Sequence, residues 1–153
     1  MIYICNINDI NPEDYDEVWI IMRSQDQVEP YVKYHSKTKW VPVLSPSTEL
    51  FHWYRQKKKE LKWTDEVFQK EYVPAFLKEI HSIPAYLSMK ALFDRQKNKK
   101  IAIGCTCPLE SRCHRSIIRG ILKKAGAEVY SDNGTSCDKY VGYGDAYFTK
   151  SHK

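Results

Sequence analysis

The chain has 153 residues and an apolar content of 42%, so it can bury the core of one domain, and wholesale disorder is excluded. Its formal charge of +5 is too mild to require a nucleic-acid partner, but it favours anionic ligands over cationic ones. We find no signal peptide and no run of transmembrane length. We therefore expect a cytoplasmic protein that does not contact membranes and keeps its five cysteines reduced.

Apolar runs at intervals along the chain predict short strands. The run at 17–22 is continuous, which is typical of a buried central strand, and it ends at Arg23. Residues 25–39 carry no clear pattern and receive no assignment. The segment 40–44 predicts a short strand or an extended entry to the next helix. The predicted strands are 1–7, 17–22, 40–44, 101–107 and 127–130.

Four helices are predicted between the third and the fifth of these strands. The first has a strong start signal, because Ser45 can cap the helix, Pro46 fits its first position and Glu49 is an early acid. Pro74 is expected to kink the second helix. The predicted starts are Ser45, Thr64, Ser82 and Ser111, the last of these as an N-cap.

Strands that alternate with helices are typical of α/β proteins whose parallel sheet is covered by helices. The pattern predicts a layered α/β/α domain with a mainly parallel central sheet. We expect this single domain to span residues 1–153 and the aromatic C-terminal segment 131–153 to pack on it.

The segment 101–119 predicts a buried strand, a short loop and the first turns of a helix, with three cysteines and one histidine at the junction. Gly104 in this strand would let a neighbouring backbone come close. At about 100° per residue, His114 falls on the helix face that carries Ile117 and Ile118, whereas Arg119 points to water. Open parallel sheets bind ligands where strands end and helices begin, so this junction is the best candidate for a site.

The junction supports three interpretations. The first is a buried cysteine cluster with a hydrogen-bonded core histidine. In the second, helix N-terminal amides and Arg115 hold an anion, and a thiol whose pKa is lowered by the helix end and His114 acts as a nucleophile. The third is a metal site made of Cys105, Cys107, Cys113 and His114. Its C-x-C-x5-C-H spacing differs from the usual zinc patterns, so we expect neither a tightly bound metal nor another cofactor.

Several motifs follow one another in an order that resembles the YeaO-like family of domains of unknown function, over roughly residues 17–125. They are a strand ending in Arg23, the segment Ser45-Pro46-Ser47-x-Glu49-Leu50, Phe68 and Tyr72 on one helix, Cys105, and the triplet Cys113-His114-Arg115. Ser45 stands where that family often has alanine. The resemblance implies an α/β fold and the same site. It implies no reaction, because the family is itself uncharacterised.

We therefore hypothesise that the domain binds a phosphorylated or nucleotide-like small molecule and acts on it. The roles are Arg23 and Arg115 as anion clamps, Cys105 and Cys113 as catalytic thiols, His114 as acid/base or orienter, and Ser45 and Ser47 as donors at a helix N-terminus.

The alternative is a non-catalytic accessory factor that binds nucleic acid or protein through Lys57–Lys59, Lys97–Lys100 and the tyrosines. A closed pocket that gathers the clamps and the histidine would favour the first hypothesis. A continuous exposed groove of basic and aromatic side chains would favour the second.

Overall fold

The structure is a computed structural model that describes residues 1–107, 110–131, 142–145 and 147–148. Its centre is a five-stranded sheet with the strand order β3-β2-β4-β1-β5, in which every neighbouring pair is parallel. The strands are β1 (Ile2–Asn6), β2 (Glu17–Ile20), β3 (Thr38–Trp40), β4 (Ile101–Cys105) and β5 (Val129–Ser131). The predicted layered α/β fold with a parallel sheet is confirmed. The third strand lies earlier than predicted, because Pro42 begins a 3-10 turn and cannot donate to a ladder.

The helices of the described residues follow the predicted order, with one addition. They are α1 (Pro30–Lys33), α2 (Thr48–Lys59), α3 (Asp65–Val67), α4 (Val73–Ile80), α5 (Ile83–Arg95) and α6 (His114–Lys124). The short α1 falls in the segment that carried no clear pattern. A π-helical segment, Phe68–Tyr72, joins α3 to α4 just before Pro74, at the place where a kink was predicted. None of the described helices is long and apolar enough to span a membrane.

Two helix starts differ from the predictions. Helix α2 begins after Ser47, whose hydroxyl accepts from the Leu50 N–H, because Ser45 instead ends the 3-10 turn and donates its hydroxyl to the Pro42 carbonyl. Helix α6 begins at His114 with Cys113 as its N-cap, and no side chain caps it. Ser111, the predicted cap, lies in the preceding 3-10 turn. Both shifts place the N-cap two residues beyond the predicted one.

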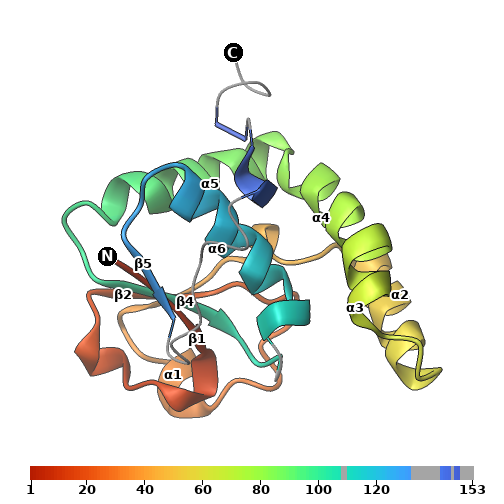
Figure 1. The fold of residues 1–153 in the computed structure, drawn as a ribbon. Helices are drawn as coiled ribbons and strands as arrows, with labels where there is room; N and C mark the ends of the chain where they lie inside the picture. Colours follow the sequence, from red (N-terminus) through yellow and green to blue (C-terminus); the bar gives the residue numbers. More distant parts are fainter. Residues whose placement is uncertain (108–109, 132–141, 146, 149–153) are drawn as a thin grey trace.

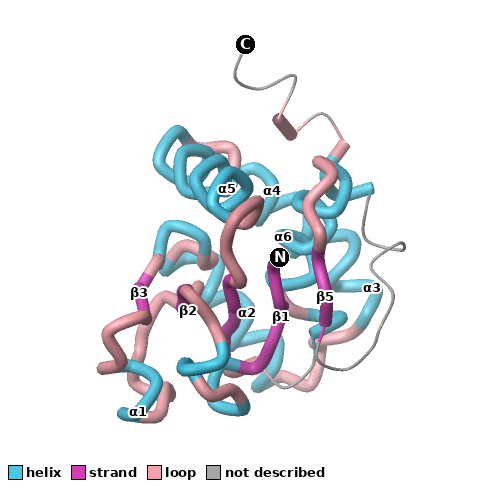
Figure 2. The backbone as a smooth tube through the Cα atoms, turned by 90° about the vertical axis from the view of Figure 1, so that its left-hand side faces the viewer, coloured by secondary structure: helices cyan, strands magenta, loops and turns pink. Residues whose placement is uncertain are grey.

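The two faces of the sheet are covered by elements of different length (Figures 1 and 2). Helices α4, α5 and α6 cover one face. The core on that face includes Ile2, Ile4, Trp19, Ile101 and Ile103 with Phe76, Met89, Leu92, Ile117 and Ile118. Short elements that include α1 cover the other face, where the core consists of Cys5, Ile7, Ile10, Val18, Ile20, Val28, Val32 and Ala102. The third layer of the domain is therefore thin.

Arg119 is fully buried, so the prediction that it points to water was wrong. A residue of the C-terminal chain packs on α6. Gly144 lies so close that an added Cβ would meet the backbone of α6 at Ile121. Farther along, Tyr147 donates its hydroxyl to the Ile80 carbonyl. A helical wheel of α6 carries no information about a segment that packs on it from another part of the chain.

The connections that follow β2 and β4 leave the sheet towards opposite faces. After β2 the chain passes Val28 and Val32 on the face of α1, whereas after β4 it enters α6 on the other face. Because β2 and β4 are neighbours, their carboxyl ends form a topological switch point, which is where open parallel sheets bind ligands. This edge of the sheet carries the cysteine and histidine junction.

At the opposite, amino-terminal edge of the sheet, Glu17 is a buried carboxylate among several donors. Trp19 Nε1 lies 3.0 Å and Arg95 Nε 2.8 Å from its oxygens. The ammonium groups of Lys39 and Lys99 lie 3.1 Å and 3.3 Å away. Burial by itself would raise the pKa of Glu17, but these partners outweigh it and lower the pKa to about 2.

Replacing Glu17 by glutamine is expected to lower the free energy of unfolding at neutral pH by about 2–3 kcal/mol. The folded pKa lies below the ordinary value of 4.5. The carboxylate therefore stabilises the fold fully above pH 4.5, and this contribution is lost as the pH falls towards 2. Urea denaturation followed by tryptophan fluorescence at a series of pH values measures both effects. Glu13→Gln, which removes an exposed carboxylate paired with His35 and Lys37, should change little. A Glu17→Gln variant with the same acid dependence as the wild type would contradict the assignment.

Candidate functional site

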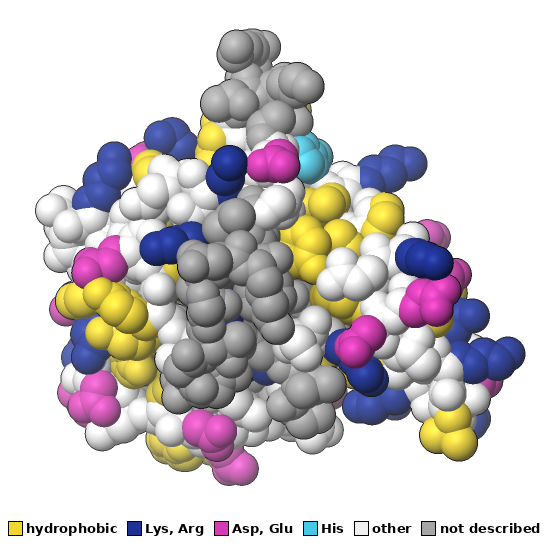
Figure 3. Space-filling view, in the orientation of Figure 1, with side chains coloured by type: hydrophobic (Ala, Val, Ile, Leu, Met, Phe, Trp, Pro, Cys, Tyr) yellow, Lys and Arg dark blue, Asp and Glu magenta, His cyan; other side chains and the backbone are white. Residues whose placement is uncertain are grey.

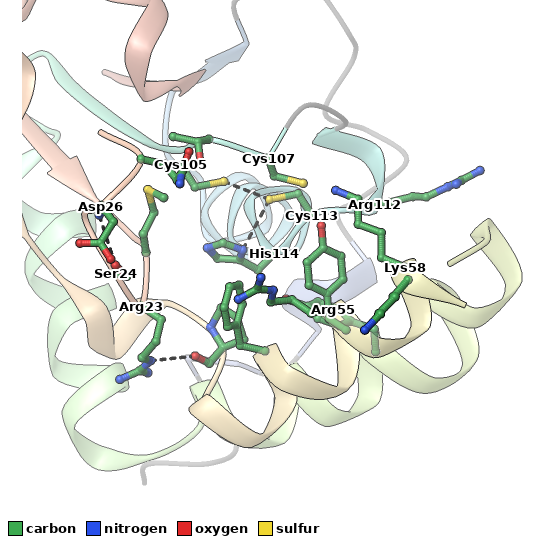
Figure 4. A pocket seen from close by; sticks show the side chains of 18 residues that line it. Arg23, Ser24, Asp26, Arg55, Lys58, Cys105, Cys107, Arg112, Cys113 and His114 are labelled. Atoms are coloured by element: carbon green, nitrogen blue, oxygen red, sulfur yellow. Dashed lines mark hydrogen bonds between the residues drawn. The ribbon is translucent and has the colours of Figure 1, made fainter. Parts of the chain in front are cut away.

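A pocket of about 670 Å³ opens at the carboxyl ends of β2 and β4. Its walls come from the loop after β2, from helix α2, and from the junction of β4 with α6. Figure 4 shows His114 and the cysteines between the Arg23–Asp26 segment on one side and Arg55 and Lys58 of α2 on the other. The lining residues are Met22, Arg23, Ser24, Asp26, Gln27, Pro46, Phe51, Tyr54, Arg55, Lys58, Lys59, Tyr72, Cys105, Thr106, Cys107, Arg112, Cys113 and His114.

The imidazole of His114 is held in one orientation at the start of α6. Its Nε2 lies 2.6 Å from the carbonyl oxygen of Ile21, which directly follows β2. A carbonyl can only accept, so Nε2 carries the proton and Nδ1 has a free lone pair. The ring also packs against Phe76, with 5.5 Å between the ring centroids. The sheet and α4 thus aim Nδ1 at the cysteines.

Two buried thiols lie beside this nitrogen. Cys113 Sγ is 3.5 Å from His114 Nδ1 and 3.2 Å from Cys105 Sγ. Cys105 ends β4 and Cys113 caps α6, so the junction of strand and helix brings them together. The three atoms Cys105 Sγ, Cys113 Sγ and His114 Nδ1 all lie within 4.8 Å of one another. We call these three side chains the Cys/His centre. The sequence predicted all three of them as site residues, and the structure brings them together.

The environment of the Cys/His centre favours uncharged groups. Burial raises the pKa of the Cys113 thiol to about 12, and the neighbouring Cys105 thiol adds to the effect. Burial likewise lowers the pKa of His114 to about 4, and the charge of Arg115 adds to it. Near neutral pH the pair is therefore a thiol and a neutral imidazole. The lowered thiol pKa expected from the helix end is not what this position produces, because burial outweighs the helix end.

Arg115 lies behind the Cys/His centre and does not line the pocket. It is buried, and one of its terminal nitrogens donates to the Cys107 carbonyl at 2.6 Å. Its Nε has no hydrogen-bond partner among the described residues. Burial works to lower the pKa of Arg115, but the thiols of Cys113 and Cys105 raise it above its ordinary value. The guanidinium therefore braces the loop after β4 and supplies positive charge next to the sulfurs.

The other predicted clamps and donors contribute mainly to the shape of the pocket. Arg23 lines the pocket, but its Nε and one terminal nitrogen donate to the carbonyls of Pro46 and Pro42, at 3.0 Å and 3.1 Å. Ser45 and Ser47 are not among the lining residues. The backbone N–H and hydroxyl of Ser47 both donate to the carboxylate of Glu79. The N-terminus of α2 thus already holds an anionic group of the chain itself.

Helix α2 supplies a wall of the pocket that sequence reasoning missed. Phe51, Tyr54, Arg55 and Lys58 follow one another at intervals of three, one and three residues, which places them on one helix face. This spacing could have been read from the sequence. What the sequence did not reveal is that this face of α2 lies opposite the Cys/His centre. The lysine run at 57–59 is accordingly divided, because Lys58 and Lys59 line the pocket and Lys57 does not.

Basic side chains outnumber acidic ones around the pocket. Among the described lining residues, the basic ones are Arg23, Arg55, Lys58, Lys59 and Arg112, and the acidic one is Asp26. Arg112 is also paired with Asp65, with 2.6 Å between its Nε and the carboxylate. Arg55 and Lys58 are exposed, and each lies over an aromatic ring of its own helix. The charged lining of the pocket is therefore mostly basic.

Comparisons with known proteins identify a family. A family model described as "Active DUF488-N3 subclade" matches residues 2–126. The matched segment contains β1 to β4, the helices α1 to α6 of the described residues and the whole Cys/His centre. No curated protein and no solved structure matches the chain.

Proposed function

The chain belongs to the DUF488 family, and we propose that its pocket binds a phosphorylated or nucleotide-like small molecule and acts on it. One observation carries the proposal: a buried Cys/His centre opens onto a pocket whose charged lining is mostly basic. The description of the matching subclade as active agrees with a catalytic role. A cytoplasmic location, where cysteines stay reduced, is part of the proposal.

Helix α2 provides the groups that suit such a ligand. Arg55 and Lys58 are exposed side chains on the pocket wall, and their N–H donors match phosphate oxygens. Phe51 and Tyr54 stand on the same wall and offer aromatic faces to a flat ring. The pocket volume of about 670 Å³ falls within the range of small-molecule sites. The ligand would place its anionic group against α2 and its reacting group at the Cys/His centre.

The Cys/His centre supplies the reactive groups. We propose Cys105 and Cys113 as the reactive thiols. His114 Nδ1 is the proposed proton acceptor or coordinating atom, because the other ring nitrogen donates to the Ile21 carbonyl. Arg23 closes the opposite side of the pocket. In this proposal Arg115, Ser45 and Ser47 do not contact the ligand. They hold in place the loops that carry the residues lining the pocket.

The pocket's walls favour this function over that of an accessory factor for nucleic acid or protein. Lys97–Lys100 precede β4 and therefore lie at the amino-terminal edge of the sheet, opposite the pocket. There Lys99 pairs with Glu17, and Lys97 with Asp94. Figure 3 shows basic side chains around α2 and α3 at the lower right, mixed with acidic ones. On the described surface these two lysine runs do not join into one basic groove.

Anions are expected to stabilise the protein through α2. Thermal melts with phosphate, sulfate, a panel of nucleoside monophosphates and a short single-stranded oligonucleotide should show a raised melting temperature with the small anions. At an anion concentration of about 100 times the dissociation constant, the free energy of unfolding should rise by about 2.7 kcal/mol. The double variant Arg55→Gln, Lys58→Gln should lose most of this shift.

Lys57→Gln is the matched control, because Lys57 belongs to the same lysine run but lies outside the pocket lining. It should keep the full anion effect. If no small anion raises the melting temperature, or if the double variant keeps the whole shift, the pocket is misassigned. Stabilisation by the oligonucleotide alone would instead favour the accessory-factor alternative.

A further inference from the structure

The Cys/His centre has the composition of a transition-metal site. Two thiol sulfurs and one imidazole nitrogen meet within 4.8 Å, and all three side chains are buried. Thiolate and imidazole are the ligand types that zinc prefers among common protein donors. Cys113 interacts with His114 Nδ1 and with the Arg115 guanidinium.

The distance between Cys113 Sγ and His114 Nδ1 fits tetrahedral coordination. With Zn–S of about 2.3 Å and Zn–N of about 2.0 Å, a tetrahedral ion holds a sulfur and a nitrogen about 3.5 Å apart, and two sulfurs about 3.8 Å apart. Cys113 Sγ and His114 Nδ1 are 3.5 Å apart, and the two sulfurs are 3.2 Å apart. On binding the ion, the two sulfurs would move apart by about 0.6 Å, and Cys105 Sγ, which lies within 4.8 Å of the other ligand atoms, would come to about 3.5 Å from His114 Nδ1.

The surroundings of the three side chains resemble the outer shell of a metal site. A metal-bound histidine usually donates its second N–H to a carbonyl or carboxylate, which fixes the ring and its tautomer. The Ile21 carbonyl has this role for His114. The buried Nε of Arg115 has no hydrogen-bond partner among the described residues, and its guanidinium interacts with Cys113. A thiolate at Cys113 would place a negative charge next to this guanidinium.

We propose that Cys105, Cys113 and His114 bind one Zn²⁺ ion, with the fourth coordination position open to the pocket. All three residues line the pocket, so the open position faces the space where a ligand would lie. Three protein ligands and one open position are typical of catalytic rather than structural zinc. The ion would polarise a phosphoryl oxygen or a bound water there. The use of the open position rests on the proposed function, but the binding of the ion does not.

This inference reverses the expectation from the sequence spacing. The usual zinc motifs place two ligands on one turn, whereas here the ligands come from the end of β4 and the start of α6. Cys107, which the spacing suggested as a ligand, is half-buried and lies outside the set of three atoms. Figure 4 shows it beside Cys113. We therefore assign it no direct bond to the ion.

Zinc content and cobalt spectra test the proposal. Untagged protein purified without chelator should contain about one zinc per chain by elemental analysis. After removal of the metal, added Co²⁺ should give the absorption bands of a tetrahedral thiolate site. Cys105→Ser, Cys113→Ser and His114→Ala should each lower the affinity for Co²⁺ by at least about tenfold, while Cys107→Ser keeps it.

Three outcomes would overturn the proposal. They are metal at trace level with no cobalt bands in the wild type, full cobalt affinity in Cys113→Ser, and loss of the metal in Cys107→Ser to the same extent as in Cys113→Ser. The wild-type spectrum keeps the test valid if a variant fails to fold. Melts with phosphate on the same preparation separate the two proposals. An anion effect without metal overturns only this one, and metal without an anion effect overturns only the proposed function.

Discussion

Replacing His114 by alanine is expected to abolish the function of the site and to leave the fold largely intact. The side chain lies in the first turn of α6 and lines the pocket, so water can enter the space that it leaves and can donate to the Ile21 carbonyl. Cobalt binding measures the loss at the Cys/His centre. Urea denaturation measures the free energy of unfolding. This energy should change by less than it does when a core residue of the same helix is replaced.

Ile118→Ala provides that comparison. Ile118 is one turn farther along the same helix and is completely buried in the core. Removing its methyl groups from a packed interior should cost about 2–5 kcal/mol and leave cobalt binding in place. If His114→Ala instead destabilises the fold as severely as Ile118→Ala does, the histidine is a structural hydrogen-bonding residue. The interpretation of the junction as a buried, inert cluster would then be correct.

Replacing Gly104 by alanine is expected to destabilise the protein by about 3 kcal/mol or more. Gly104 pairs with Cys5 across the parallel strands β4 and β1. An added Cβ would press against the carbonyl oxygen of Cys5, closer than Cβ atoms approach in folded proteins, and against its sulfur at 3.1 Å. The contact is with backbone inside a buried ladder, so the strands would have to separate.

The same substitution should disturb the site. The Gly104 carbonyl accepts from the Ile21 N–H, and the Ile21 carbonyl in turn orients His114. Urea denaturation and cobalt binding should therefore both report a loss. Gly142→Ala is the control, because a Cβ added there meets nothing within 4 Å. Wild-type stability in Gly104→Ala would mean that β1 and β4 can move apart at little cost.

The elements that position the site could be predicted because their signals are local. The apolar run before Cys105 and the isoleucines of α6 specify a buried strand and a buried helix face. The rule for parallel sheets then places the site at their junction. Gly104 could be interpreted in the same way, since a glycine in a buried strand indicates a close backbone approach, and Cys5 provides it.

The parts that could not be predicted depend on packing between distant segments. The solvent-facing assignment of Arg119 failed because a helical wheel does not show which distant segments pack on α6, as Gly144 does. The division between Lys57 and Lys58 depends on how α2 is rotated towards the pocket. The displaced start of α2 has a more local cause, since the turn that begins at Pro42 uses Ser45 as its end. When several residues that can cap a helix follow one another, the sequence does not show at which of them the helix begins.

The central claim is that one pocket holds an anionic small molecule between α2 and the Cys/His centre. A crystal structure of the protein grown with a nucleoside monophosphate tests this most directly. The account predicts the phosphate within hydrogen-bonding distance of Arg55 or Lys58, and the rest of the ligand extending towards Cys113 and His114. A ligand bound elsewhere on the surface, or a pocket that stays empty at saturating concentration, would contradict it.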